Sequence, residues 1–211
     1  MDSLIFDVDG TLWDSTEQVA RSWSLHLREQ GIEKELTGAV LKPLFGMLLG
    51  DIAANLFPEA DAGWRQTLIE GCCEAENKYL LTHPGIVFEG VEEMLERLSG
   101  QMPLFIVSNC QAGYVESFLE STGLTPYFKD HLCPGDTGLA KAGNLIRMKE
   151  RWSLKDPWYV GDTMGDFRAC EEAGVPFIHA GYGFGEVPQA LYRVSCPQEV
   201  IRLAEKLKSH P

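Results

Sequence analysis

The chain has 211 residues, 45% of them hydrophobic and 23% charged, so it can bury one main core and is not a disordered sequence. Asp and Glu outnumber Lys and Arg by 31 to 18, and the net charge of −13 argues against nucleic-acid polymers and anionic membranes as partners. The six cysteines are too few for a disulfide scaffold, and none forms a Cys-x-x-Cys pair. We therefore expect reduced, packed thiols without a metal role.

The N-terminus and the hydropathy pattern predict a soluble cytoplasmic protein. Met1-Asp2-Ser3 leads directly into an apolar segment, without a basic region or a cleavage site. No window approaches the roughly 18 apolar residues that a membrane span requires.

The first predicted strand covers residues 4–8, and a long helical region follows it. Residues 14–84 contain several helical patterns and no convincing strand. Apolar residues at every third or fourth position predict a helix that stops at Gly31 and a long helix over about 64–79. The segment 36–49 is predicted to form shorter helical pieces.

After this helical insertion, short apolar segments alternate with helical patterns. Further strands are predicted at 104–107, 158–160 and 176–180, with a weaker one at 131–133. Helices are predicted around 91–98, 115–119, 145–152 and 200–207. The alternation predicts an α/β fold with a Rossmann-like parallel sheet and helices on both faces. We expect an α/β core domain made of 1–13 and 85–211, with a small all-helical domain, 14–84, inserted after the first strand.

Two carboxylates end the first predicted strand, in the segment Asp7-Val8-Asp9-Gly10. Asp is unfavourable in strands, and the period of two sends Asp7 and Asp9 to the same side of an extended chain. They could bracket one reacting group or one cation. Asp-Gly is also a common turn pair, so this segment alone is equally consistent with a turn.

Polar residues follow two later strands in the same way. Ser108-Asn109 comes after one, and Gly161-Asp162 comes after another. In a parallel sheet these ends meet at one edge, where open α/β sheets bind ligands. Asp7, Asp9 and Asp162 would form an acidic cluster whose repulsion requires a cation, and carboxylate oxygens favour Mg²⁺. The sequence therefore predicts a magnesium site at this edge.

Four segments resemble the motifs of one superfamily in order and spacing. Asp7-x-Asp9-Gly10-Thr11, Ser108-Asn109, Lys141 and Gly161-Asp162-x-x-x-Asp166 are similar to the four motifs of the haloacid dehalogenase-like hydrolases. The resemblance covers nearly the whole chain and is nearest to small phosphatases of phosphoglycolate-phosphatase type, because Trp13-Asp14-Ser15 follows the first motif. In that family the helical insertion is a cap that closes over the strand ends.

This resemblance implies a magnesium-dependent phosphatase that acts on a small phosphate ester through an aspartyl phosphate. Asp7 would be the nucleophile, and Asp9 would protonate the leaving oxygen and then activate water. Ser108 and the Asn109 N–H would hold phosphoryl oxygens at a helix start, and Lys141 would add positive charge. The implied metal ligands are Asp7, Asp9 through its backbone carbonyl, Asp162 and, through water, Asp166. The implied substrate-binding residues are Thr11, Ser108, Asn109 and Lys141, with Lys42 and Gly46 in the cap.

Some of these residues have structural alternatives. Ser108 could cap the following helix, and Asp166 could be an acid favoured in the first turn of a helix. Lys141 could be a solvated surface lysine, since Lys149 and Lys155 are also available, and Lys42 could equally be a surface residue.

Other functions are compatible with parts of the pattern. A phosphomutase of the same fold would need a bisphosphate activator, and a receiver-like phosphoacceptor would hold its phosphate without turnover. Asp9 disfavours a dehalogenase, whose chemistry needs no acid for the leaving group. The glycines at 181, 183 and 185 are expected in a loop near the site, because Glu186 breaks a dinucleotide-binding fingerprint.

Overall fold

Short apolar segments form the central sheet of the computed structural model, which describes residues 1–208. The sheet has six parallel strands in the order β5-β4-β1-β6-β7-β8. Their bounds are β1 Ser3–Phe6, β4 Leu104–Val107, β5 Phe128–Leu132, β6 Pro157–Gly161, β7 Phe177–Ala180 and β8 Tyr192–Val194. Every residue of β1 and β4 is buried, which explains why these strands are apolar without alternation.

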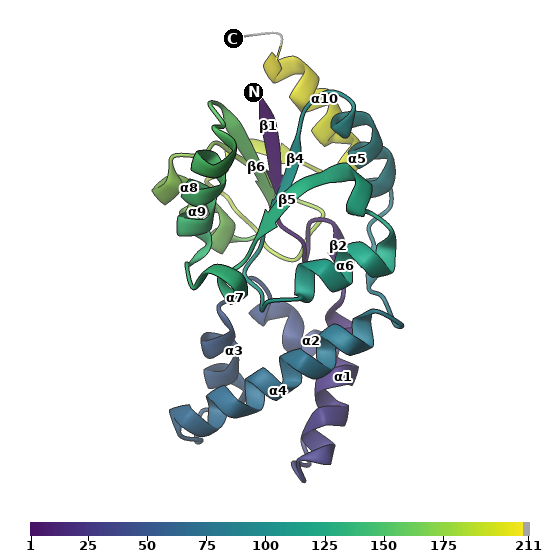
Figure 1. Ribbon diagram of the computed structural model, residues 1–211, viewed down its shortest axis with the longest axis vertical. Helices are drawn as coiled ribbons and strands as arrows, with labels where there is room; N and C mark the ends of the chain where they lie inside the picture. Colours follow the sequence, from purple (N-terminus) through teal and green to yellow (C-terminus); the bar gives the residue numbers. More distant parts are fainter. Residues whose placement is uncertain (209–211) are drawn as a thin grey trace.

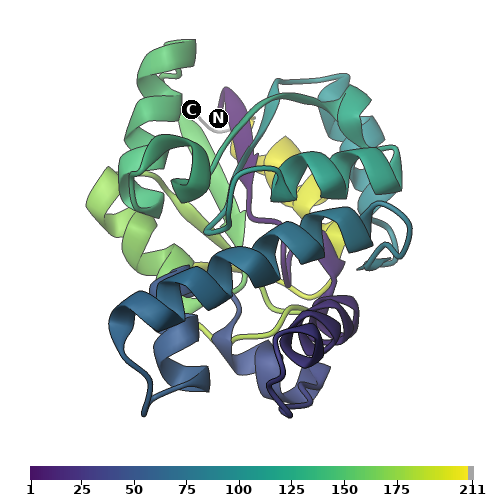
Figure 2. The same cartoon turned by 60° about the horizontal axis from the view of Figure 1, so that its bottom comes forward.

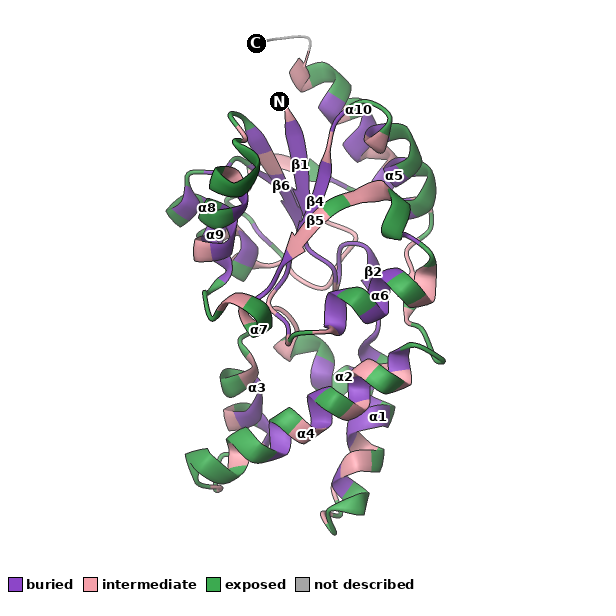
Figure 3. Ribbon diagram, viewed as in Figure 1, coloured by how far each residue is buried: buried purple, intermediate pink, exposed green. Residues whose placement is uncertain are grey.

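Helices cover both faces of this sheet (Figure 1). Along β1, Leu4 and Phe6 join the apolar cluster that includes helices α5, α6 and α10, whereas Ile5 joins the cluster with α8 and α9. The bounds are α5 Val91–Ser99, α6 Tyr114–Thr122, α7 Pro134–Thr137, α8 Lys141–Trp152, α9 Met164–Ala173 and α10 Pro197–Lys208, with a 3-10 turn η2 at Thr125–Tyr127. Buried residues concentrate in the sheet and on the inward helix faces (Figure 3). The predicted α/β fold with a parallel sheet is confirmed.

The helical insertion lies at the carboxyl ends of the strands. Its elements are α1 Thr16–Glu29, α2 Gly38–Leu41, the 3-10 turn η1 Lys42–Leu44, α3 Leu49–Leu56 and α4 Ala62–Leu80. Helix α4 packs against α1 and α3 and runs past α6 of the core (Figure 2). We call residues 14–84 the cap; the exact boundaries of the two domains remain a prediction.

The chain leaves and re-enters the core through a pair of short strands that the sequence does not predict. Strand β2, Trp13–Asp14, pairs antiparallel with β3, Ile86–Val87. Each has two residues, too few to show a hydrophobic period. Within residues 1–208, none of the helices is long and apolar enough to cross a membrane.

Candidate active site

The candidate site lies where the strand order reverses, at the carboxyl end of β1 between β4 and β6. Asp7, Ser108 and Asp162 each come directly after one of these three strands, and all three are buried. Gly10 permits the close approach of the β1 loop to Asp162. Its φ is +76°, and a Cβ at this position would lie 2.1 Å from Asp162 Oδ2. The predicted convergence of these strand ends on one edge is therefore observed.

Lys141 is buried among carboxylates, which is inconsistent with a solvated surface lysine. It is the first residue of α8, and its Nζ lies 3.0 Å from Asp7 Oδ1 and also contacts Asp166 Oδ1. Burial alone would lower the pKa of Lys141, but Asp166 and Asp7 outweigh it and raise that pKa. Lys141 therefore stays charged beside Asp7. The alternatives Lys149 and Lys155 are elsewhere: Lys149 donates to the Ala173 carbonyl, and Lys155 is exposed.

Asp166 caps helix α9, as an acid in the first turn of a helix can, and it also contacts Lys141. It forms a capping box with Thr163 at the start of α9, with Oδ2 accepting from the Thr163 N–H at 2.9 Å and hydroxyl at 2.7 Å. Its Oδ1 accepts from Lys141 and from the Tyr159 hydroxyl. Both oxygens thus already have protein donors, so Asp166 contributes to the site by holding Lys141.

The glycine-rich loop after β7 closes over Asp162. The Phe184 N–H donates to Asp162 Oδ2 at 2.7 Å, and a Cβ on Gly183 would lie 2.2 Å from the Gly10 carbonyl oxygen. Asp162 Oδ1 is buried and has no hydrogen-bond partner among the described residues. Burial, with Asp166 and Asp7 adding to it, raises the pKa of Asp162 to about 8.

The donor set fits a divalent cation. Oxygens of Asp7, Asp162 and Asp166 lie within 4.8 Å of one another, and Lys141 is the one residue in the described part of the chain that supplies an opposing charge in contact with them. Burial raises the pKa of Asp7 to about 6 despite that lysine. A hard cation would compensate both Asp7 and Asp162 and would meet the unpartnered oxygen of Asp162.

Asp9 is turned away from this cluster and is held by hydrogen bonds to one of its oxygens. Oδ1 accepts from the Tyr114 hydroxyl at 2.7 Å, the Ser15 hydroxyl at 2.8 Å and Trp13 Nε1 at 3.0 Å. Burial nevertheless raises the pKa of Asp9 to about 7, against these three donors. Asp9 also lines the pocket between the core and the cap. Its other oxygen is left to exchange a proton near neutral pH.

Three polar residues are predicted to bind phosphate: Thr11, Ser108 and Asn109. Ser108 is buried, and its side chain acts to lower the pKa of Asp7. Thr11 Oγ1 and Asn109 Oδ1 are buried without a hydrogen-bond partner in residues 1–208. The prediction that Ser108 and Asn109 begin a helix is wrong: α6 begins only at Tyr114, after Gly113 in the left-handed region. The two residues lie in the loop after β4, so Ser108 does not cap a helix.

Of the two cap residues predicted to face the substrate, Gly46 lies at the pocket beside Asp9 and Lys42 does not. The Gly46 carbonyl accepts a hydrogen bond of 2.9 Å from Asn109 Nδ2 and lies at the pocket beside Asp9. Lys42 contacts other residues, with its Nζ 3.6 Å from Asp14 Oδ2 and 4.5 Å from the centroid of the Phe184 ring. Lys42 therefore bridges cap and core and is absent from the lining of that pocket.

Two residues of this region, Tyr114 and Glu76, are not predicted as functional from the sequence. Tyr114 holds Asp9, although it is 105 positions away in the chain, and only the packing of α6 brings it there. Glu76 is buried in the cap at the same pocket. The sequence does hold a signal for Glu76, because it is a charged residue next to the apolar positions 68, 72, 75 and 79 of a predicted helix.

Comparisons with known proteins show the family of the chain. The sequence profile of the family described as haloacid dehalogenase-like hydrolase matches residues 4–180. The phosphoglycolate phosphatase of Xylella fastidiosa (strain 9a5c) is 31% identical over 190 residues, covering 86% of this chain and 81% of the relative. The phosphoglycolate phosphatase of Yersinia pestis is 26% identical over 193 residues, covering 85% and 80%.

Solved structures show the same fold. A haloacid dehalogenase-like family hydrolase from Streptococcus pneumoniae superposes with a TM-score of 0.83 at 19% identity, covering 97% of this chain and 98% of the other. A predicted phosphoglycolate phosphatase from Haemophilus somnus gives a TM-score of 0.77 at 19% identity, with coverage of 97% and 98%. The profile match, the curated relatives and the shared fold together show that the chain belongs to the haloacid dehalogenase-like hydrolases, as a phosphatase that resembles phosphoglycolate phosphatase.

Proposed function

We propose that the protein hydrolyses the phosphate ester of a small metabolite through an aspartyl phosphate on Asp7 and depends on Mg²⁺. The observation that carries this proposal is the pairing of Asp7 with Lys141 and the separate holding of Asp9 by Tyr114. A nucleophile kept ionised and an acid with a pKa near 7 are the two groups that such a reaction needs. The names of the curated relatives support phosphoglycolate as one candidate substrate. A sugar phosphate and a nucleotide are further candidates among small phosphate esters.

In the first step an Asp7 carboxylate oxygen attacks phosphorus, and the bond between phosphorus and the ester oxygen breaks. Asp9 gives its proton to the departing oxygen, so the product leaves as a neutral alcohol. In the second step Asp9, now a carboxylate, takes a proton from a water molecule whose oxygen attacks the same phosphorus. Asp7 is released as a carboxylate, and the product is inorganic phosphate.

The surrounding residues position the transferring group. Lys141 balances negative charge next to Asp7, while Ser108, Thr11 and Asn109 offer polar atoms to phosphoryl oxygens. Asp7, Asp162 and the backbone carbonyl of Asp9 would hold Mg²⁺. When bound, the ion reduces the repulsion between an anionic nucleophile and an anionic phosphate.

The test is phosphate release from a panel containing an aryl phosphate, phosphoglycolate, sugar phosphates and nucleotides. We expect release with Mg²⁺, none with a chelator, and recovery when Mg²⁺ is added back. Asp7→Asn should fold and be inactive, and the exposed acid Asp51 provides the matched control Asp51→Asn, which should keep full activity. Activity of Asp7→Asn, chelator-resistant turnover, or formation of an isomer in place of free phosphate would contradict the proposal.

A further inference from the structure

A mostly apolar pocket lies between the cap and the core, with Asp9 on its wall. Its cavity volume is small, about 40 Å³, and one side of it is open to solvent. Apolar side chains from α1, α2, η1 and α3 form most of the cap side, and the polar residues of the wall are Asp9, Glu76, Asn109, Gln111 and Tyr114. Among the described residues, no Lys, Arg or His lines it. Because Asp9 is the proposed proton donor to the leaving oxygen, this pocket is the space open to the alcohol half of the ester.

Glu76 is an unusual residue for the inner face of a cap helix. It is 3% exposed, and each of its oxygens has one protein donor, from α1 of the cap and from the loop after β4 of the core. Trp23 Nε1 donates to Oε2, and Gln111 Nε2 donates to Oε1 at 3.2 Å. Each carboxylate oxygen can accept a second hydrogen bond, so the group has capacity for a donor brought by a ligand.

The charges on the pocket wall disfavour a leaving alcohol that carries a carboxylate. Among the described residues the wall has the carboxyl groups of Asp9 and Glu76 and no cation. Burial raises the pKa of Glu76 to about 8, and the nearby Asp9 adds to that effect, so without a ligand this carboxyl is largely protonated at neutral pH. Lys42, the cation predicted to meet an anionic substrate, is held outside by Asp14 and Phe184. A carboxylate placed here would be desolvated with no cation to balance it, whereas an ammonium would favour the ionised form of Glu76 and form an ion pair with it.

We propose that Glu76 selects the leaving alcohol: the protein prefers phosphate esters whose small alcohol carries an ammonium group, accepts a hydroxyl less well, and rejects a carboxylate. This inference rests on the proposed function. The proposed preference differs from the names of the curated relatives, which are phosphoglycolate phosphatases, because phosphoglycolate carries a carboxylate.

Four phosphate esters with the same two-carbon frame test the preference. They are phosphoethanolamine, 2-hydroxyethyl phosphate, ethyl phosphate and 2-phosphoglycolate, with 4-nitrophenyl phosphate as a reference for the core chemistry. We expect kcat/KM to fall in that order, with phosphoethanolamine ahead of ethyl phosphate by about tenfold or more, the range of one charge-assisted hydrogen bond.

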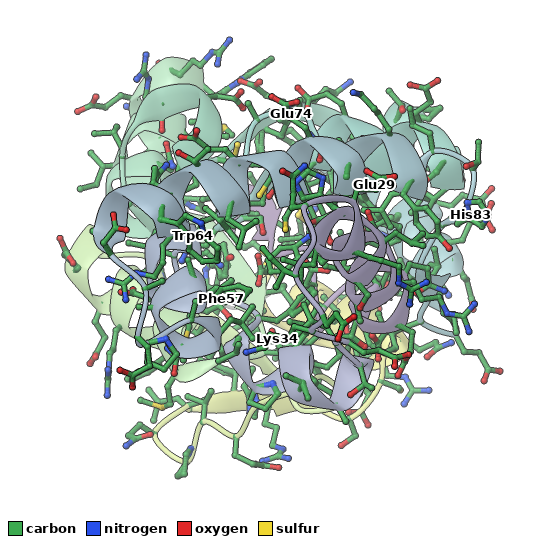
Figure 4. All side chains as sticks on the ribbon, turned by 90° about the horizontal axis from the view of Figure 1, so that it is seen from below. Glu29, Lys34, Phe57, Trp64, Glu74 and His83 are labelled. Carbon is green, nitrogen blue, oxygen red and sulfur yellow. The ribbon has the colours of Figure 1, made fainter. Side chains whose placement is uncertain are left out.

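Glu76→Gln keeps the shape of the side chain and removes its charge. It should bring phosphoethanolamine to within about twofold of ethyl phosphate, because the ion pair is lost. It should also improve phosphoglycolate relative to ethyl phosphate. The matched control is Glu74→Gln on the same helix: Glu74 is exposed and lies on the side of α4 away from α1 (Figure 4), so this variant should keep the wild-type order.

A second variant keeps the test decisive if Glu76→Gln does not fold. Leu44 is half-buried at the edge of the pocket, and Leu44→Lys would add a cation there. It should raise kcat/KM for phosphoglycolate and lower it for phosphoethanolamine, with little change for 4-nitrophenyl phosphate.

The outcomes separate the two proposals. Hydrolysis of 4-nitrophenyl phosphate together with a wild-type preference for phosphoglycolate, or with no activity on the four esters, overturns the selectivity and leaves the proposed function intact. An unchanged order in Glu76→Gln also overturns it and assigns Glu76 to holding the cap against the core. No phosphate release from any ester, the aryl ester included, overturns both.

Discussion

The hydroxyl of Tyr114 adjusts the acidity of Asp9, and Tyr114→Phe removes that hydroxyl alone. Three donors share one oxygen of Asp9, and the bond from Tyr114, at 2.7 Å, is the shortest of them. These donors favour the carboxylate, whereas burial raises the pKa of Asp9 to about 7. Losing one donor therefore moves this pKa further up, while the phenyl ring keeps its contact with Trp13.

The size of the change follows from one hydrogen bond to a charged group. Such a bond contributes about 1.5–3 kcal/mol, and about 1.36 kcal/mol corresponds to one pH unit, so we expect a rise of about 1–2 pH units. Asp9 must carry its proton to protonate a poor leaving group, so kcat/KM for an alkyl phosphate falls as the pH rises through this pKa. In Tyr114→Phe that fall should begin at a correspondingly higher pH.

The assay is kcat/KM against pH for an alkyl phosphate, with an aryl phosphate in parallel. The aryl ester needs little protonation, so its profile should change much less. Tyr159→Phe is the control, because it removes a buried tyrosine hydroxyl that bonds to the Val107 carbonyl and to Asp166 and does not touch Asp9. The reasoning is refuted if the fall of kcat/KM at high pH begins at the same pH in Tyr114→Phe as in the wild type. It is also refuted if the fall shifts equally in Tyr159→Phe.

Two further variants test the remaining site residues. Asp9→Asn should reduce turnover of alkyl phosphates much more than the first cleavage of aryl phosphates, and equal losses in single-turnover rates would argue against the acid role. Asp166→Ala should lower the free energy of unfolding by about 3–5 kcal/mol in urea titrations, since it leaves the Lys141 ammonium with one fewer buried partner. A loss below about 1 kcal/mol would show that Lys141 does not depend on that pair.

The sequence predicts the main sheet and the site edge well, for a physical reason. Strands buried on both faces are continuous apolar segments, so 104–107 is predicted at its observed bounds, and polar residues that interrupt such segments mark the strand ends. Asp7 and Asp162 are therefore visible as a cluster once the strands are assumed parallel. By contrast, β8 has three residues, only one of them buried, and shows no such pattern.

What the sequence does not predict depends on packing between distant segments. The hydrogen bond from Tyr114 to Asp9 depends on how α6 lies against the loop after β1. The pairing of Trp23 with Glu76 needs α1 and α4 to be side by side, and a tryptophan at helical spacing is read from sequence as ordinary core. The direction of Lys42 is set by Asp14 and Phe184, the latter from a loop more than a hundred residues later.

The most direct test of the central claim is to trap the phosphorylated residue. Asp9→Asn should still transfer phosphate from an aryl ester but lack the base for the second step, so an acyl phosphate should accumulate. Acid quenching, borohydride reduction, proteolysis and mass spectrometry would locate it. We predict homoserine, the reduction product of an aspartyl phosphate, at position 7 only, and only in samples given substrate and Mg²⁺. Modification of another residue, or aryl phosphate cleavage by this variant with position 7 never modified, would contradict Asp7 as the nucleophile.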